Sequence, residues 1–151
     1  MPSRLALAIV AAALLAPAPA AGQVIGEPDP EIVDGSAQKA LDAARKRWRA
    51  FGVRSYRFRV QLLCFCSNRQ TAPVVIVVRR GRPVDPPRHL RDVATVPRLH
   101  RTVQQAIDDR VEGLSVRYGR RGVPRSISID PSRMIADEQV GYSVGRVRPR
   151  G

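Results

Sequence analysis

The residues best suited to chemistry in this chain are its two cysteines, Cys64 and Cys66, which are one residue apart. Any disulfide within the chain must join them. In an extended strand their Cα atoms would lie roughly 6.5–7 Å apart, but disulfides prefer about 5.5–6 Å, so the bond requires a turn or bulge. The pattern favours a structural disulfide. Two thiolates binding a soft metal such as Zn²⁺ with His89 or His100, a redox-active pair and free buried thiols stay open as alternatives.

A second group of chemically capable residues is acidic: Asp130, Asp137 and Glu138 flank one loop of a basic chain. Their carboxylates could contribute to a Ca²⁺ site, which takes about six to eight oxygen ligands, although the spacing matches no EF-hand. Asp130 before Pro131 also fits an Asx-turn, and the other two fit ion pairs with local arginines. Ion pairing is the favoured interpretation, so we expect no bound cofactor, with Ca²⁺ or Zn²⁺ as the alternative.

Two familiar catalytic motifs are missing from the sequence, a phosphate-binding loop and His-Glu-x-x-His. Asp130 with Asp137 or Glu138 could form a carboxylate pair, but hydrolases that use such a pair need a larger cleft than a domain of this size builds. We therefore expect a protein that is not an enzyme.

The first 22 residues read as an export signal. Arg4 precedes an apolar run over residues 5–16, and small residues allow cleavage near Ala20 or Gly22. The run is shorter than the about 20 apolar residues that span a bilayer, and no second apolar segment of spanning length follows. We expect a periplasmic or secreted protein with no transmembrane segment after signal cleavage, in a compartment that favours disulfides.

The charge is strongly positive, with 26 Lys and Arg against 13 Asp and Glu. Such a balance is typical of nucleic-acid binding. Here the cations are nearly all arginine and are spread along the chain, as GC-rich codon usage produces, and an exported protein rarely meets nucleic acid. We expect no nucleic-acid partner, an unknown protein or envelope component instead, and a weak attraction to anionic surfaces such as lipid headgroups or acidic polysaccharide.

The helices that would position these residues have clear sequence signals. Residues 23–35, rich in Pro, Gly and acids, predict a flexible leader, and residues 36–148 predict one domain. Ser36 is the expected cap of a helix over residues 37–51. Thr95 caps a second helix, with Pro97 in its first turn.

Alternating apolar residues predict an antiparallel sheet. The strand that begins at Tyr56 turns apolar on both faces at Leu63 and Phe65, which predicts that its far end is covered on both sides. The fold class is α+β, with the N-terminal helix and one further helix packed on one face of a sheet of about four or five strands. The expected strands cover residues 56–64, 74–78, 114–118, 126–130 and 140–144.

Several short motifs occur in an order that resembles one known family. The motifs are Trp48, Gly52-x-x-Ser55-Tyr56, Cys64-Phe65-Cys66, Val116-x-Tyr118, Gly122-x-Pro124 and Ala136-Asp137-Glu138-x-x-x-Tyr142. Over roughly residues 43–147 the chain resembles a family of small exported bacterial proteins catalogued as domain of unknown function 6174. The resemblance implies an exported α+β domain and no established activity. It marks Trp48, Tyr56, Tyr118, Gly122, Pro124 and Tyr142 as motif and core residues.

Three positions depart from the family's pattern. His100 and Val123 stand where the family favours aromatic residues, which predicts looser packing. Gly119 stands where it usually has aspartate, which removes one acid from any metal site at that turn. The leading hypothesis is an exported, non-enzymatic binding or structural module of the bacterial envelope or secretome. The alternatives are a metal- or thiol-linked envelope protein that uses Cys64 and Cys66, and an inhibitor of a secreted enzyme.

Overall fold

The computed structural model describes residues 26–135 and 137–150 of the chain, so the predicted export signal and its cleavage site lie outside the described residues. The helices are α1 (Pro30–Val33), α2 (Ser36–Phe51), α3 (Asn68–Thr71), the 3-10 helix η1 (Arg88–Val93) and α4 (Val96–Asp108). The strands are β1 (Tyr56–Leu63), β2 (Val74–Arg79), β3 (Arg82–Val84), β4 (Gly113–Tyr118), β5 (Pro124–Asp130), β6 (Val140–Val144) and β7 (Arg148–Pro149).

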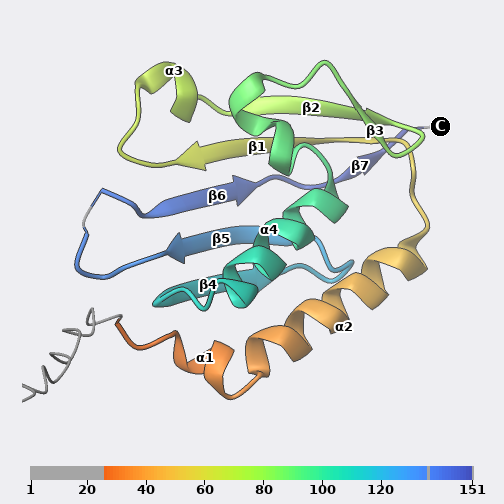
Figure 1. Cartoon of the computed structure of the whole chain (residues 1–151). Helices are drawn as coiled ribbons and strands as arrows, with labels where there is room; N and C mark the ends of the chain where they lie inside the picture. The colour runs from red at the N-terminus through yellow and green to blue at the C-terminus, as the bar shows by residue number, and fades with distance from the viewer. Residues whose placement is uncertain (1–25, 136, 151) are drawn as a thin grey trace, which may run out of the picture.

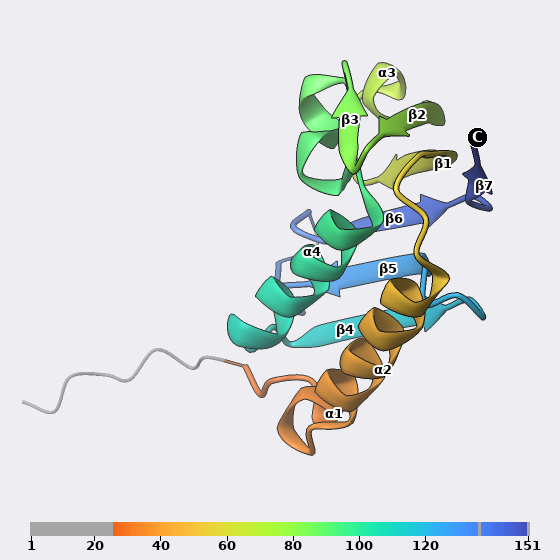
Figure 2. The ribbon, with the colours of Figure 1, turned by 90° about the vertical axis from the view of Figure 1, so that its right-hand side faces the viewer.

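The strands form one antiparallel sheet in the order β3-β2-β1-β6-β5-β4, and β7 pairs with β1 beyond the end of β6. Helices α2 and α4, with η1, lie on one face of this sheet (Figures 1 and 2). The predicted α+β class, with helices on one face of an antiparallel sheet, is therefore confirmed. The sheet has seven strands instead of the expected four or five, because the short β3 and β7 add to its ends.

The two long helices follow their sequence signals closely. In α2, the buried residues Leu41, Ala44 and Trp48 recur at helical spacing and form the face that packs inward. Ser36 is the first residue of α2 and not its cap, since Gly35 occupies the cap position. In α4, the Thr95 side chain accepts a hydrogen bond from the Arg98 backbone N–H at 3.2 Å, which satisfies one of the free donors at the helix start.

The core lies between the helices and the inward face of the sheet. Every second residue of β1 from Tyr56 to Leu62 is buried, as the alternation predicts. The Tyr56 ring packs edge-on against Trp48 of α2, with ring centroids 5.3 Å apart. Its hydroxyl accepts a hydrogen bond from the Val96 backbone N–H at 3.0 Å. One tyrosine therefore joins β1 to both long helices.

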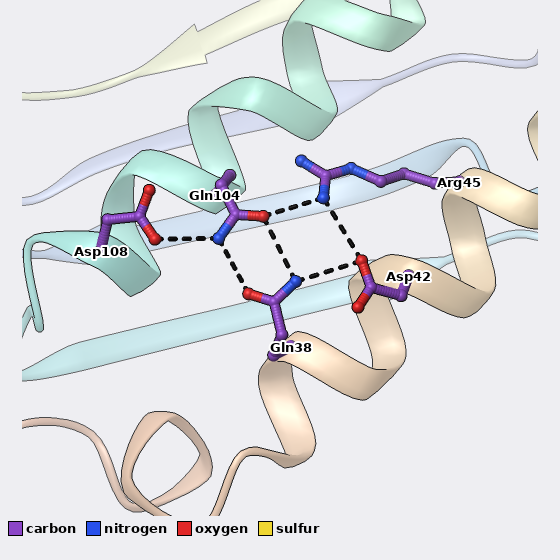
Figure 3. A network of polar contacts seen from close by, with 5 residues as sticks. All are labelled: Gln38, Asp42, Arg45, Gln104 and Asp108. Atoms are coloured by element: carbon purple, nitrogen blue, oxygen red, sulfur yellow. Dashed lines mark hydrogen bonds and ion pairs between the residues drawn. The ribbon is translucent and has the colours of Figure 1, made fainter.

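A polar network joins α2 to α4 where their exposed sides meet (Figure 3). Gln38 and Gln104 exchange amide hydrogen bonds of 3.3 and 2.8 Å. Arg45 donates to Gln104 at 2.8 Å and forms an ion pair with Asp42 at 3.3 Å, while Gln104 donates to Asp108 at 2.9 Å. Because these groups are only partly buried, the network contributes modestly to stability and mainly fixes how the helices sit against each other.

The segment before α2 differs from the flexible leader predicted over residues 23–35, because its described part, residues 26–35, belongs to the fold. Asp29 is buried, and its backbone N–H donates to the Val111 carbonyl at 2.9 Å. Its carboxylate accepts hydrogen bonds from the backbone N–H groups of Glu31 and Leu114, both at 2.9 Å. Asp29 thus caps α1 and fastens it to the start of β4.

The far end of β1 also differs from expectation. Leu63 is 47% exposed and Phe65 is 80% exposed, so the prediction that this end is covered on both faces is wrong. Both side chains belong to the sheet face that α2 and α4 leave open, or to the loop beyond it. Residues 67–72, predicted as a turn, contain the single helical turn α3, and the predicted loop over 85–92 is largely the 3-10 helix η1.

Candidate binding surface

The functional candidate that we favour is the sheet face opposite α2 and α4, here called the open face. Alternate strand residues point to it and are exposed or half-exposed, while their neighbours are buried under the helices. Arginine and serine side chains are the commonest on this face, which also carries the apolar residues Leu63, Val75, Val77 and Val84. Its strand residues include Arg57, Arg59, Gln61 and Leu63 of β1, Val75 and Arg79 of β2, Arg82 of β3, Ser115 and Arg117 of β4, Ser126 and Ser128 of β5, and Ser143 of β6.

Four arginines surround a hollow of about 430 Å³ on the open face, which we call the arginine hollow. Arg57 and Arg59 come from β1, and Arg146 and Arg148 come from the end of the chain, with Val75 of β2 beside them. A second hollow, of about 520 Å³, shares Arg57 and Arg148 and extends toward the C-terminus. All four arginines are exposed.

A β-bulge creates this arrangement. β1 pairs with β6 at Val60 and Val144, and with β7 at Arg57 and Arg148. Between these pairs, residues 145–147 therefore oppose only residues 58 and 59. An extra residue of this kind re-aims the side chains that follow it. It places Arg146 and Arg148 beside the β1 arginines, while Val147 packs against the core.

The charges on this face are poorly balanced. Arg57 lies directly opposite Arg148, and Arg79 lies directly opposite Arg82, although like charges in such positions destabilise a sheet. The only acidic residue in the described strands is Asp130, at the far end of β5. Within the described residues, the one ion pair is the helical pair in Figure 3. The open face therefore carries an unneutralised positive charge.

Two rows of polar side chains, here called the polar rows, continue from the arginine hollow across the sheet. The first row runs through cross-strand neighbours on four adjacent strands: Gln61, Ser143, Ser126 and Arg117. The second contains Ser128 and Ser115 beside Gly141. Strands lie about 4.8 Å apart, so the first row offers a side-chain donor or acceptor at that interval, and the second row offers one on β4 and β5 only.

The cysteine loop closes the other end of the open face. Cys64 and Cys66 form a disulfide with a Cα–Cα distance of 5.2 Å, as the favoured interpretation expected. The loop bounds a hollow of about 330 Å³ that Phe65, Ser126, Ser128 and Gln139 help to line. The bonded pair is thus a structural element beside the surface.

Neither histidine joins the cysteine pair. His100 is buried under the helices, where its Nε2 donates a hydrogen bond to the Gly122 carbonyl at 2.7 Å. His89 is exposed in η1. In the part of the chain that the structure describes, no three His, Cys, Asp or Glu side chains are grouped as a metal site would require.

The three acidic candidates are not gathered into a ligand set. Asp130 ends β5, whereas Asp137 and Glu138 are exposed in the loop that leads to β6. The structure instead uses two acids that sequence reasoning missed, the buried Asp29 and Glu112. Glu112 accepts a hydrogen bond from the Arg133 backbone N–H at 2.7 Å and so holds the β5–β6 loop. Asp29 had a recognisable helix-cap signal, but nothing local marked Glu112.

The motif residues are structural, and they lie on the helical side of the sheet. Trp48, Tyr56, Gly122 and Pro124 are buried, and Tyr118 and Tyr142 are half-buried. Burial raises the pKa of Tyr56 to about 12, although its hydrogen bond from Val96 opposes the shift. Burial likewise raises the pKa of Tyr118 to about 12, and it raises the pKa of Tyr142. These phenols stay neutral and act as core residues.

His100 and Val123, where the departures from the family's pattern predict looser packing, are both buried. His100 is 3% exposed and Val123 is 5% exposed. Burial lowers the pKa of His100, partly opposed by its hydrogen bond to Gly122, while the charges of Arg45 and Arg49 lower it further. The neutral imidazole therefore replaces an aromatic ring as a packed, hydrogen-bonded core group. Gly119 lies in the tight turn between β4 and β5, where its backbone N–H donates to the Val123 carbonyl at 2.9 Å.

The helical side carries one larger cleft, of about 700 Å³, between α4, η1 and the end of β5. Its lining mixes charges of both signs, with Arg91, Arg98 and Arg101 against Asp92 and Asp109. Since these charges largely offset one another, the cleft favours no class of ligand as clearly as the open face does. No helix in the described part of the chain combines the length and apolar character needed to cross a bilayer.

Comparison with known proteins agrees with the resemblance seen in the motifs. A family model described as "Family of unknown function (DUF6174)" matches residues 40–149. No curated protein matches the chain, and no solved structure matches it. The match begins within α2 and ends with β7, so it includes the whole sheet and the arginine hollow. The chain therefore belongs to the DUF6174 family of unknown function.

Proposed function

We propose that this protein is an exported, non-enzymatic binding module that holds its partner on the open face of the sheet. The observation that carries this proposal is that the two faces of the sheet differ in composition and role. The motif residues on the helical side build the core, whereas the open face presents exposed arginines and hydroxyls with no core role. Like charges placed together at a cost in stability are typical of a functional surface.

The choice of a binding module over an enzyme rests on the placement of the reactive groups. The phenols are buried with raised pKa values, the cysteines are bonded, and the three acidic candidates are dispersed. Residues 141–145 match Gly-x-Ser-x-Gly, but Ser143 lies inside strand β6 and not at the strand-to-helix turn that exposes the nucleophile in that motif. The test is turnover of generic esterase, phosphatase and glycosidase substrates by the purified chain. We expect none. Turnover that is lost in Asp137→Ala would show that the chain is an enzyme.

Site-specific photo-cross-linking in the producing cell tests the binding face. A photoreactive residue replaces Ser115 or Ser143 on the open face, or Arg101 on the exposed side of α4 as a matched control. We expect conjugates from both open-face positions and few from α4, recovered from the exported fraction. Conjugates from α4 alone would refute the assignment of the face, and recovery only inside the cell would refute export.

A thiol- or metal-linked function remains the second candidate because the Cys64–Cys66 pair borders the open face. It requires that Cys64→Ser changes the metal content or redox behaviour of the chain. We expect the variant only to unfold more easily, by roughly 1–2 kcal/mol, because so short a loop restricts the unfolded chain little. Metal analysis of both proteins distinguishes the two outcomes.

A further inference from the structure

We propose that the partner is an acidic polysaccharide, whose carboxylates bind in the arginine hollow and whose hydroxyls bind the polar rows beside it. This inference rests on the proposed function, since it names the partner of the same open face. Four features of the open face support it: the four guanidinium groups of the arginine hollow, the like-charge pairs, the polar rows, and the hollow beside the cysteine loop that Phe65 helps to line.

The arginine hollow is suited to a multiply charged ligand. Its four guanidinium groups come from two chain segments, and no acid in the described strands lies near them. Each guanidinium presents a planar fork of donors that matches a carboxylate in two hydrogen bonds. A bound anion would also relieve the repulsion between Arg57 and Arg148. The hollow's volume lies within the range of small-ligand sites.

The polar rows extend the surface beyond one anion. The row from Gln61 through Ser143 and Ser126 to Arg117 crosses four strands, which corresponds to roughly 15 Å. Serine hydroxyls donate and accept hydrogen bonds, as sugar hydroxyls require. The hollow next to the row combines Phe65 with Ser126, Ser128 and Gln139. That mixture fits a sugar ring, which has an apolar face and polar edges.

A lipid surface fits less well. Binding to a bilayer combines cations with adjacent large apolar side chains that enter the interface. Here the arginine hollow has one exposed large apolar side chain, Val75, which is 55% exposed. The most exposed large apolar residues are Phe65 and Met134, at 80% and 81%. They lie beyond the ends of β1 and β5, at the opposite end of the sheet from β7 and its arginines (Figure 1).

The test compares two variants that each remove two exposed arginines. The double variant R57Q/R148Q removes the like-charge pair, and R47Q/R101Q removes the same charge from α2 and α4 as a control. The purified chain is titrated with alginate, a polymer of uronic acids, with neutral dextran, and with phosphatidylglycerol vesicles. We expect alginate binding that weakens at least about tenfold in R57Q/R148Q and by less than about twofold in R47Q/R101Q, with dextran bound far more weakly.

The melting temperature shows that R57Q/R148Q is folded, and we expect it to equal or exceed that of the parent because a repulsive pair is removed. Equal weakening in both variants, unchanged binding in R57Q/R148Q, equal binding of dextran, or binding to the vesicles alone would each overturn the inference. So would failure to bind alginate. If open-face cross-links persist in that case, only the polysaccharide assignment fails. If they are lost as well, the proposed function fails with it.

Discussion

Replacing Gly122 by alanine tests how the β4–β5 turn is built against α2. Gly122 has φ +74°, and a Cβ there would overlap the Ala44 carbonyl oxygen and lie 2.8 Å from its carbonyl carbon. The left-handed conformation alone costs a side chain about 1–2 kcal/mol. The overlap forces α2 away from the turn, and such overpacking costs about 1–3 kcal/mol more. We therefore expect Gly122→Ala to lower the free energy of unfolding by about 2–5 kcal/mol.

Gly81→Ala separates the two contributions. Gly81 has φ +81°, and a Cβ there would meet nothing within 4 Å, so this variant carries only the conformational cost. The assay is urea unfolding followed by the fluorescence of Trp48, the single tryptophan, which is 8% exposed. If Gly122→Ala is no less stable than Gly81→Ala, the close approach of the turn to α2 is wrong.

Four further predictions concern buried polar groups, each read out by chemical unfolding. Tyr56→Phe should cost about 1–3 kcal/mol because it leaves the buried Val96 N–H without its acceptor. Tyr118→Phe should be neutral or stabilising, since the Tyr118 hydroxyl is buried without a hydrogen-bond partner among the described residues. An equal loss of stability in Tyr56→Phe and Tyr118→Phe would contradict the hydrogen bond from Val96 to Tyr56. Burial lowers the pKa of His100, so as the pH falls the imidazole is protonated in the unfolded chain before it is protonated in the folded one. The contribution of His100 to the free energy of unfolding should therefore be full above about pH 6.5 and decline below it. If His100→Gln shows the same dependence of that free energy on pH, this prediction is wrong. Asp29→Ala should cost about 1–3 kcal/mol and expose residues 26–35 to proteases, which a truly flexible leader would not show.

Much of the fold could be predicted because its signals are local. Leu41, Ala44 and Trp48 mark the buried side of α2, and Thr95 with Pro97 marks the start of α4. The alternation along β1 likewise predicts which residues face the core. The strand count was underestimated because β3 and β7 are too short to show a period.

The candidate surface was only half visible in the sequence. The alternation placed Arg57 and Arg59 on the polar face of β1, but nothing local indicated that Arg146 and Arg148 would join them. Their position depends on the pairing of β1 with the C-terminal segment and on the bulge within it. Phe65 was misjudged for a related reason, since the strand pattern cannot show that its end is uncovered. Surfaces assembled from distant strands require the pairing register, which the sequence does not state.

The most direct test of the open face as the binding surface is to map backbone amide NMR shifts of the purified chain as alginate oligomers are added. We predict saturable shifts concentrated at Arg57, Arg148 and Ser143, with the exposed side of α4 unaffected. Shifts concentrated along α4, around the cleft lined by Arg98 and Arg101, would contradict the account.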